Sequence, residues 1–535
     1  MAVNLAGGSG RGAAGSSAPT VISEKGLSIE DVVHVARGFG HVVLDVESRE
    51  KLIKNRAAVE RLITKEVPIY GITTGFGRFS DVFIPAGHRQ ELQQKLLQSH
   101  AAGVGSVLPR DVTRAAMLLR ANSLGRGYSG VRPVVVERLC DLLNAGVHPV
   151  MPEQGSLGAS GDLAPLAHMA LVLTGEGQAE FGGRVMDGRE ALRAAGLVPL
   201  RLEAKEGLAL INGTQVMTAV GILAWYDAMR LLQRANLVAG LSFEALQGIP
   251  AAFDERIAAL RPHPGQLWAA RALRETVRDS RLVTGPGELR VQDAYSLRCL
   301  PQVHGAAYDA LSYIESMLAR EINAVTDNPI VFNDPDEIIS GGNFHGQPIA
   351  QVMDLLAIAM TDLAAMAERR IERLVNPQYN GGLPAFLAVD GGLNSGFMLA
   401  QYTAASLVAE NRVLSHPASV DSIPSSAGQE DHVSMGTIAA RKARKVVDNA
   451  AAVLGIELCV AAQAADLRVA KLRGQELRQA PDPEAVASQL GAGTRRAYLA
   501  VRAKVPFMAE DRILASDLEL ARQVLMDEVS WGAAD

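Results

Sequence analysis

Apolar residues recur every three or four positions along much of the chain, which is the spacing of one face of an α-helix. The clearest stripe consists of Val352, Leu356, Met360, Leu363, Ala367, Ile371 and Leu374. It predicts a helix of about six turns that ends before Asn376-Pro377. Arg369, Arg370 and Arg373 lie in its last turns, where cations suit the helix dipole.

Alanine- and leucine-rich patterns of the same kind predict further long helices, and few alternating strand patterns lie between them. These helices are expected over residues 216–246, 303–322, 397–413 and 438–470. The predicted fold is therefore mainly α, a bundle of long helices. Aromatic residues make up only 4% of the chain, and small residues at facing positions let such helices approach closely.

Glycine and proline clusters divide the chain into four predicted regions. We expect a flexible tail over 1–27 and a region rich in glycine loops over 28–225. The central helical bundle is expected over 226–480. A C-terminal helical segment, 481–535, follows Pro481-Asp482-Pro483.

Charge and composition narrow the classes of partner. A formal net charge of −6 gives no basic excess that would favour nucleic acid or an anionic membrane. No secretory signal is expected at the start, and the apolar stretch 449–465, interrupted by Glu457, predicts a buried helix rather than a membrane span. Cys140, Cys299 and Cys459 are too far apart in sequence to indicate a zinc or disulfide framework. We expect a cytoplasmic protein whose partner is a small molecule or another protein chain.

One loop of small residues carries candidate chemistry. Gly155-Ser156-Leu157-Gly158-Ala159-Ser160-Gly161-Asp162 precedes an apolar helical pattern over 163–173. Asp162 suits the N-cap of that helix, and Pro165 suits its first turn. The loop therefore ends at a helix N-terminus, where free N–H groups and the helix dipole favour negative charge. Alone, however, an Ala-Ser-Gly tripeptide is no more than a turn.

The whole run GSLGASGDLAPLAH resembles the signature of the aromatic amino acid ammonia-lyases and aminomutases, and the resemblance extends from about Asp31 to the neighbourhood of Asp511. It implies that Ala159-Ser160-Gly161 cyclises autocatalytically to methylidene-imidazolone, so that no external cofactor is needed. Gly161 leaves its nitrogen room to attack the Ala159 carbonyl, and loss of water from Ser160 creates the electrophilic methylidene. The inserted shielding domain of the larger plant-type phenylalanine enzymes is not expected.

A second glycine-rich loop, Tyr70-Gly71-Ile72-Thr73-Thr74-Gly75-Phe76-Gly77, reads locally as a surface turn. The resemblance implies that it closes over the substrate and that Tyr70 is the base for the β-proton. Because a phenol must be deprotonated to act as a base, we expect the site to lower the pKa of Tyr70. Asn212 either caps a helix or, as the resemblance implies, binds the amino-acid end of the substrate.

Gln292, Tyr295 and Arg298 have the spacing i, i+3 and i+6, which predicts that they lie on or near one side of a helix. A solvated polar face would show the same pattern. The resemblance implies that Gln292 contacts the substrate, that Tyr295 lies near the electrophile and that Arg298 binds the substrate carboxylate. The planar guanidinium suits that last role better than a lysine ammonium.

Two turn-rich segments complete the candidate site. Thr326-Asp327-Asn328-Pro329 and Asn343-Phe344-His345-Gly346 indicate a connector, in which the resemblance implies that Phe344 lines the ring pocket. Gln429-Glu430-Asp431-His432 has two carboxylates beside a histidine, but we expect no metal because no second compact ligand cluster accompanies it. Gln429 and Glu430 instead resemble substrate-facing residues, with Glu430 helping to move protons. Ser425 and Gly428 stand where many relatives have Thr and Asn.

The Ser99-His100 pair bears on the substrate. A lone histidine in a helix is usually a packing or surface residue. In phenylalanine lyases, however, the matching pair is aromatic–aliphatic, in tyrosine lyases it is His-Leu, and in the histidine-specific enzymes it resembles this one. Imidazole has a donor and an acceptor nitrogen, and a site that pairs both rejects a hydrocarbon ring. His100 and Glu430 provide such partners.

We therefore expect non-oxidative elimination of ammonia from L-histidine to trans-urocanate, the first step of histidine degradation. Whether the electrophile bonds to the amine or to the ring stays open. A tyrosine or phenylalanine ammonia-lyase or a 2,3-aminomutase is the nearest alternative, and a non-catalytic helical scaffold is a remote one. The resemblance further implies a homotetramer whose active sites combine Tyr70 and Arg298 from different chains.

Overall fold

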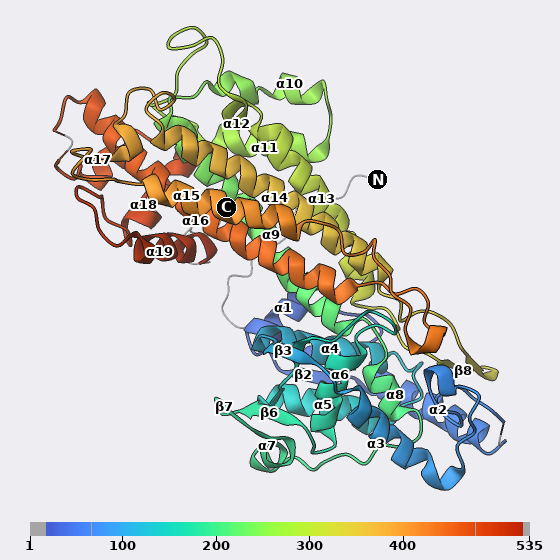
Figure 1. Ribbon diagram of the computed structural model, residues 1–535. Helices are drawn as coiled ribbons and strands as arrows, with labels where there is room; N and C mark the ends of the chain where they lie inside the picture. The colour runs from blue at the N-terminus through green and yellow to red at the C-terminus, as the bar shows by residue number, and fades with distance from the viewer. Residues whose placement is uncertain (1–17, 66, 477, 528–535) are drawn as a thin grey trace.

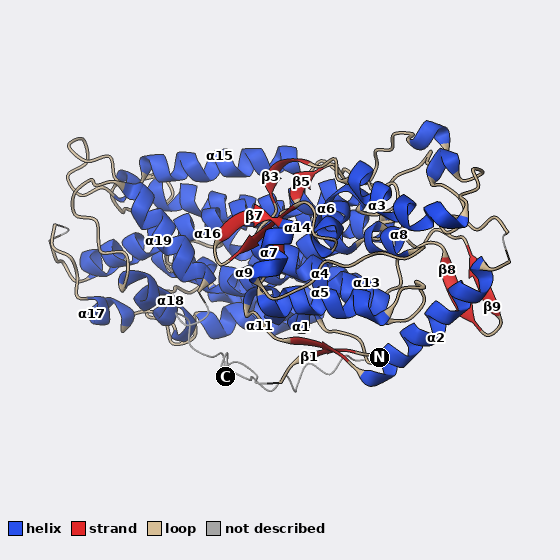
Figure 2. Cartoon of the chain, turned by 90° about the horizontal axis from the view of Figure 1, so that it is seen from below, coloured by secondary structure: helices blue, strands red, loops and turns tan. Residues whose placement is uncertain are grey.

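The computed structural model describes residues 18–65, 67–476 and 478–527 of the chain. Figure 1 shows a bundle of long helices at one end and a region of shorter helices and small sheets at the other. Figure 2 shows that helix predominates and that the strands are short. The predicted mainly α class is confirmed.

The long helices of the bundle match the predicted ranges closely. They are α9 (Gln215–Ala245), α13 (Leu300–Glu321), α14 (Gln347–Val375), α15 (Met398–Leu414) and α16 (Gly436–Leu472). α16 packs along both α14 and α9. Small residues allow close approach as expected, since a Cβ added at Gly221 of α9 would lie 2.8 Å from the Met353 sulfur of α14.

The core of the bundle contains a buried ion pair between α14 and α16. Arg370 donates two hydrogen bonds to Glu457, of 2.6 and 2.8 Å, and Ser242 of α9 donates a third at 2.7 Å. Arg370 and Glu457 are both fully buried. Arg370 lies in the last turns of α14, as expected, but its charge is paired with Glu457 in the core. Arg369, in contrast, pairs with the neighbouring Glu368.

Two helices of the described residues, α14 and α16, are long and apolar enough to cross a membrane by composition. In α16, however, 94% of the most apolar window is buried inside the protein, and in α14 the share is 56%. The predicted buried helix over 449–465 is thus confirmed as part of α16.

Shorter helices and two- or three-stranded sheets form the N-terminal region. Its helices are α1 (Ile29–Arg37), α2 (Val46–Ile63), α3 (Arg89–His100), α4 (Arg110–Gly125), α5 (Pro133–Ala145), α6 (Leu163–Leu173), α7 (Gly188–Ala194) and α8 (Glu206–Ile211). β1 (Thr20–Ile22) pairs in parallel with β2 (Val42–Leu44), and β3 (Val104–Val107) pairs antiparallel with β5 (Pro152–Gln154). β4 (His148–Pro149), β6 (Gln178–Phe181) and β7 (Arg184–Asp187) form an antiparallel sheet. Later in the chain, β8 (Ile330–Asn333) pairs antiparallel with β9 (Asp336–Ile339).

The far end of the bundle carries the remaining helices. They are α10 (Glu255–Ala259), α11 (Pro264–Thr276), α12 (Tyr295–Arg298), α17 (Pro483–Ala487), α18 (Ala492–Arg502) and α19 (Leu514–Met526). Short 3-10 turns occur at Gly77–Phe79, Ala86–His88, Pro250–Phe253, Ala385–Leu387 and Ser426–Gly428.

The predicted flexible tail over 1–27 is corrected in its last part. Thr20–Ile22 forms β1, and Ile22 packs into the core with 1% of its surface exposed. Residues 1–17 of that predicted tail lie outside the described residues. The boundary expected at 225 falls within α9, which runs without interruption from the N-terminal region into the bundle (Figure 1). The region boundaries otherwise stay predictions.

A buried carboxyl group joins the end of α9 to the start of α18. The Glu244 carboxyl accepts a hydrogen bond from the Gly491 N–H at 3.0 Å and one from the Thr494 hydroxyl at 2.8 Å. Burial raises its pKa to about 8, although these hydrogen bonds and the charge of Arg495 lower it. Glu244 therefore binds its proton more tightly in the folded protein than in the unfolded chain.

This difference predicts a pH-dependent stability. The contribution of Glu244 is fully present below its unfolded pKa near 4.5 and is lost as the pH rises through about 8. Between pH 5 and pH 9 the unfolding free energy of the natural chain should fall, and that of Glu244→Gln should fall by about a few kcal/mol less. Thermal midpoints of both proteins across this range provide the measurement. Parallel pH profiles would contradict the assignment.

Candidate active site

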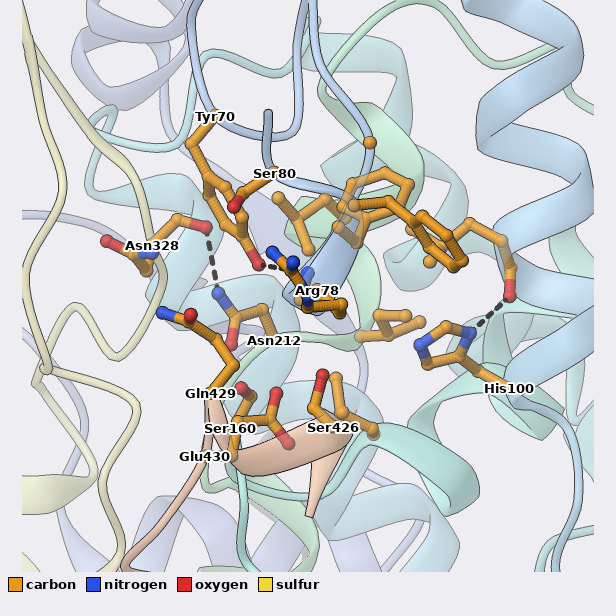
Figure 3. A pocket seen from close by; sticks show the side chains of 18 of the residues that line it. Tyr70, Arg78, Ser80, His100, Ser160, Asn212, Asn328, Ser426, Gln429 and Glu430 are labelled. Atoms are coloured by element: carbon orange, nitrogen blue, oxygen red, sulfur yellow. Dashed lines mark hydrogen bonds between the residues drawn. The ribbon is translucent and has the colours of Figure 1, made fainter. Parts of the chain in front are cut away.

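A cavity of about 1070 Å³ opens in the N-terminal region, next to α3 and α8. Loops from distant parts of the sequence converge on it, and Figure 3 shows their side chains pointing toward one another. Many of the predicted site residues line it, namely Tyr70, Ser99, His100, Ser160, Asn212, Phe344, Gln429 and Glu430. Ala159 and Gly161 flank Ser160 in the same loop.

The predicted electrophile loop is held by the segment that follows α8. Gly161 and Gly213 form a bridge like that of two parallel strands. The Gly213 N–H donates to the Ser160 carbonyl oxygen at 3.2 Å, and the Asp162 N–H donates to the Gly213 carbonyl oxygen at 2.7 Å. A Cβ at position 161 would lie 2.0 Å from that carbonyl oxygen, and Gly161 has a φ of +72°. Only glycine fits here.

Asp162 has a role that differs from the predicted one. It stands at the start of α6, but its side chain makes no cap there. Its carboxylate instead accepts hydrogen bonds of 2.8 Å from both Val216 and Met217, the first turn of α9. Ser156 and Thr437 also donate to it. The predicted cap of α6 is therefore wrong, because the free N–H groups of α9 lie closer to this buried side chain.

Tyr70 projects from its glycine loop into the cavity (Figure 3). Its phenolic oxygen accepts a hydrogen bond of 3.2 Å from the Gly77 N–H, across the turn of the same loop. Burial raises the pKa of Tyr70, Glu430 adds to that effect, and the Gly77 hydrogen bond opposes it. The expectation of a lowered pKa is thus wrong for the single chain, because burial outweighs the hydrogen bond.

Asn212 ends α8 and is almost completely buried. Its side-chain amide donates to the Asn328 carbonyl at 2.8 Å, which turns its oxygen away from Asn328 and toward Ser160 (Figure 3). That oxygen is buried and accepts no hydrogen bond within the described residues. Asn212 therefore presents an acceptor in the cavity, as a residue that binds an ammonium or amine group requires.

His100 forms the end of α3 and faces the cavity. Its Nδ1 lies 2.9 Å from the Leu96 carbonyl oxygen and 3.0 Å from the Ser99 hydroxyl. Burial lowers the pKa of His100, so the ring is neutral at neutral pH. Because the Leu96 carbonyl oxygen can only accept a hydrogen bond, the proton of the neutral ring lies on Nδ1. The lone pair of Nε2 is then available to accept a hydrogen bond.

The loop around Glu430 brings a carboxylate into the same cavity. The Ser425 hydroxyl donates to this carboxylate at 2.9 Å, and the backbones of the two residues pair with each other. Ser425 supplies a hydroxyl, as the Thr that the family resemblance leads one to expect there would, and Gly428 takes a φ of +86°, which the expected Asn also tolerates. The two departures are therefore compatible with the loop. No group of three or more His, Cys, Asp or Glu side chains that could hold a metal ion occurs in the described ranges.

Phe344 and Gln429 also line the cavity. Phe344 precedes α14 and is half-buried, whereas Gln429 is exposed and lies next to Glu430 (Figure 3). An aromatic face beside amide and carboxylate groups suits a small polar ring.

The predicted site residues Gln292, Tyr295 and Arg298 do not line this cavity. α12 is at the opposite end of the molecule from α3 and α8 (Figure 1). The helix begins only at Tyr295, so the predicted helical position of Gln292 is wrong. The preceding segment is held outside the helix because the Asp293 carboxylate accepts hydrogen bonds from the Ile249 N–H and from Arg290. Tyr295 is 70% exposed, and the Arg298 guanidinium lies 4.6 Å from the centre of its ring.

Several polar residues at the site escape sequence reasoning. Arg78 lines the cavity from the Tyr70 loop (Figure 3). Behind Asn212, Lys205 and Asp327 form a fully buried ion pair of 2.6 Å, and Arg120 is buried beside them. Arg120 and Lys205 look like surface residues of helices in the sequence. The Asp-Asn-Pro run that begins at Asp327 indicates a structured turn, but it does not indicate that this turn lies at the site.

Comparison with known proteins decides the family. A model of the aromatic amino acid lyases matches residues 27–503 of this chain. The chain belongs to the aromatic amino acid lyase family. The family and the enzyme class expected from the sequence are confirmed.

Individual relatives of this lyase cover nearly its whole length. The histidine ammonia-lyase of Caldanaerobacter subterraneus subsp. tengcongensis is 54% identical over 505 residues, 94% of this chain and 96% of the relative. The solved tyrosine aminomutase from Streptomyces globisporus has a TM-score of 0.88 at 40% identity, covering 95% of this chain and 97% of that one. The histidine ammonia-lyase from Trypanosoma cruzi has a TM-score of 0.85 at 38% identity, covering 96% and 94%.

Proposed function

We propose that this lyase eliminates ammonia from L-histidine to give trans-urocanate, with methylidene-imidazolone formed from Ala159-Ser160-Gly161 as its electrophile. The observation that carries the proposal is the convergence of Ser160, Asn212, His100 and Glu430 on one cavity. The histidine ammonia-lyases among its relatives, 54% identical in one case, support the same substrate.

The loop fits the formation of this group. Ring closure joins the Gly161 nitrogen to the Ala159 carbonyl carbon, and that carbonyl oxygen leaves as water with the two amide hydrogens. A second water carries away the Ser160 hydroxyl and its Hα. The bridge between Gly161 and Gly213 holds the loop in a bend and leaves no space for a side chain at position 161. When formed, the group would supply an electrophilic methylidene carbon from Ser160, which lines the cavity.

The remaining cavity residues suit a histidine substrate. His100 Nε2 accepts from one imidazole N–H, and the Glu430 side chain, which lines the same cavity, is a second hydrogen-bond partner for the ring. The free acceptor of Asn212 binds the substrate amine. Tyr70 is the base for the β-hydrogen, and its raised pKa in the single chain requires further positive charge before it loses its proton.

We propose that this charge arrives with a second copy of the chain, in a homotetramer whose sites combine Tyr70 of one chain with Tyr295 and Arg298 of another. In support, α12 lies far from the cavity of its own chain, and the buried Nε of Arg298 has no hydrogen-bond partner among the described residues. Apolar grooves along α13 to α15 and between α15, α16 and α19 offer surfaces for subunit packing.

The rival within the family is a tyrosine or phenylalanine enzyme or a 2,3-aminomutase, since a tyrosine aminomutase is among the structural relatives. His100 and Glu430 favour histidine, because a phenyl ring offers no hydrogen-bond partner to His100 Nε2 or to the Glu430 side chain. We further propose a cytoplasmic location and a place at the start of histidine breakdown. Incubating the purified enzyme with L-histidine and following urocanate by absorbance and mass is the direct test.

Ser160→Ala removes the hydroxyl whose loss creates the methylidene. We expect a folded protein with nearly complete loss of urocanate formation. Intact mass provides an independent readout, because the natural chain should have lost two water molecules and the variant should not show that loss. Full activity of Ser160→Ala would end the proposal.

Replacing Ser99-His100 with Phe-Leu, as Ser99→Phe with His100→Leu, removes the polar partner of the imidazole and adds apolar surface for a phenyl ring. Histidine turnover should fall much further than phenylalanine turnover. kcat/KM for both substrates, compared with the natural chain, measures the change. An equal fall for both, or unchanged histidine turnover, would show that this pair does not recognise the ring.

A mixing experiment tests the shared site. Tyr70→Phe and Arg298→Ala should each be nearly inactive alone, but in mixed tetramers some sites combine an intact Tyr70 with an intact Arg298. With equal mixing about a quarter of the sites are whole, because each of two chain positions is correct about half the time. Co-expression, mass analysis of the tetramers and urocanate formation provide the readout. Absence of recovery in confirmed mixed tetramers would mean that one chain supplies both residues.

A further inference from the structure

Arg120 of α4 lies behind the electrophile loop without a carboxylate of its own. It is completely buried, and its Nη1 donates to the Asn212 carbonyl oxygen at 2.6 Å and to the Gln215 side-chain oxygen at 3.0 Å. Its Nη2 donates to the Ser123 hydroxyl at 3.2 Å, and its Nε has no partner among the described residues. All these acceptors are neutral groups.

The nearby ion pair does not neutralise this charge. Asp327, whose negative charge acts on Arg120, is already bonded to Lys205 at 2.6 Å. The three buried groups Arg120, Lys205 and Asp327 therefore carry an excess of one positive charge. Burial lowers the pKa of Arg120 to about 10, which still leaves it a cation at neutral pH. A buried cation that meets only neutral acceptors is costly to stability. Arg114 and Arg468 are buried on backbone carbonyls in the same way, but of these three arginines only Arg120 bonds to the segment that holds the electrophile loop.

A chain of hydrogen bonds leads from this cation to the electrophile loop. Arg120 bonds to the carbonyl oxygen of Asn212, and the N–H of the same peptide group belongs to Gly213. That N–H donates to the Ser160 carbonyl oxygen at 3.2 Å. A cation on the oxygen of an amide draws electrons from its nitrogen, which makes the N–H a stronger donor.

This inference rests on the proposed function. In the methylidene-imidazolone proposed there, the Ser160 carbonyl is the one that is conjugated with the methylidene. When a nucleophile bonds to the former Ser160 Cβ, negative charge spreads to the Ser160 carbonyl oxygen. A preorganised donor at that oxygen lowers the energy of the charge. We propose that Arg120 is a positioning residue that polarises the 212–213 peptide, so that the Gly213 N–H activates the electrophile.

The test uses the full-length enzyme and Arg120→Lys and Arg120→Gln variants. Arg114→Gln is the matched control, because Arg114 lies on the same helix, is equally buried and also donates to backbone carbonyls, those of Val35 and Leu143. Its contacts lie away from Asn212. Intact mass first measures loss of two water molecules in each protein.

Cyanide then probes the electrophile without the substrate. Its carbon bonds to the methylidene carbon while solvent supplies a proton, so each modified chain gains the mass of one HCN. We expect Arg120→Gln to form the group but to react with cyanide about tenfold more slowly, less than the 10²–10³ that loss of a whole oxyanion donor costs. kcat should fall in parallel with little change in KM, Arg120→Lys should be intermediate, and Arg114→Gln should match the natural chain.

The outcomes separate this inference from the proposed function. If the natural chain shows no loss of water, the proposed function fails and this inference fails with it. If the group forms in the natural chain and both Arg120 variants react at its rate, only the role of Arg120 is overturned. A folded Arg120→Lys without the group would assign Arg120 to its formation instead, and an equal slowing in Arg114→Gln would reveal a general effect of altering α4. Either result overturns the inference.

Discussion

Two glycines in contact fix the geometry on which the site depends. At Gly161 and Gly213 the backbones approach so closely that a Cβ on Gly161 would lie 2.0 Å from the Gly213 carbonyl oxygen. The hydrogen bonds on either side of this contact leave little freedom to the Ser160 carbonyl or to Asn212. Because backbone rather than side chains forms the contact, its geometry is independent of rotamer changes, which suits a loop that must bend for cyclisation.

The helical bundle is tied to this contact through Asp162. Its buried carboxylate accepts from the first N–H groups of α9 and from Thr437 in the first turn of α16. Both helices run from the site into the bundle, where α16 packs along α9 and α14. A shift of either helix would therefore disturb the loop, so the bundle acts as a rigid support for a site built mostly from loops.

Sequence patterns predicted the features that depend on local order. The stripe ending at Leu374 gave the course of α14, and the small-residue run around Ser160 located the electrophile loop. They failed where a distant neighbour decides. Asp162 caps α9 instead of α6, because partners far apart in the sequence compete with local ones, and no local pattern indicated that Arg370 pairs with Glu457. The pKa of Tyr70 likewise depends on burial, which no local pattern records.

Two of the buried arginines, Arg370 and Arg120, show how the surroundings of a charge separate a structural from a chemical role. Arg370 meets Glu457 in a two-pronged ion pair, so its charge is cancelled where it stands and its field is short-ranged. Arg120 meets only neutral oxygens, so its field reaches the peptide groups around Ser160. The first arrangement holds two helices in register. The second places a cation that has no ion-pair partner of its own beside the loop where negative charge is expected to develop.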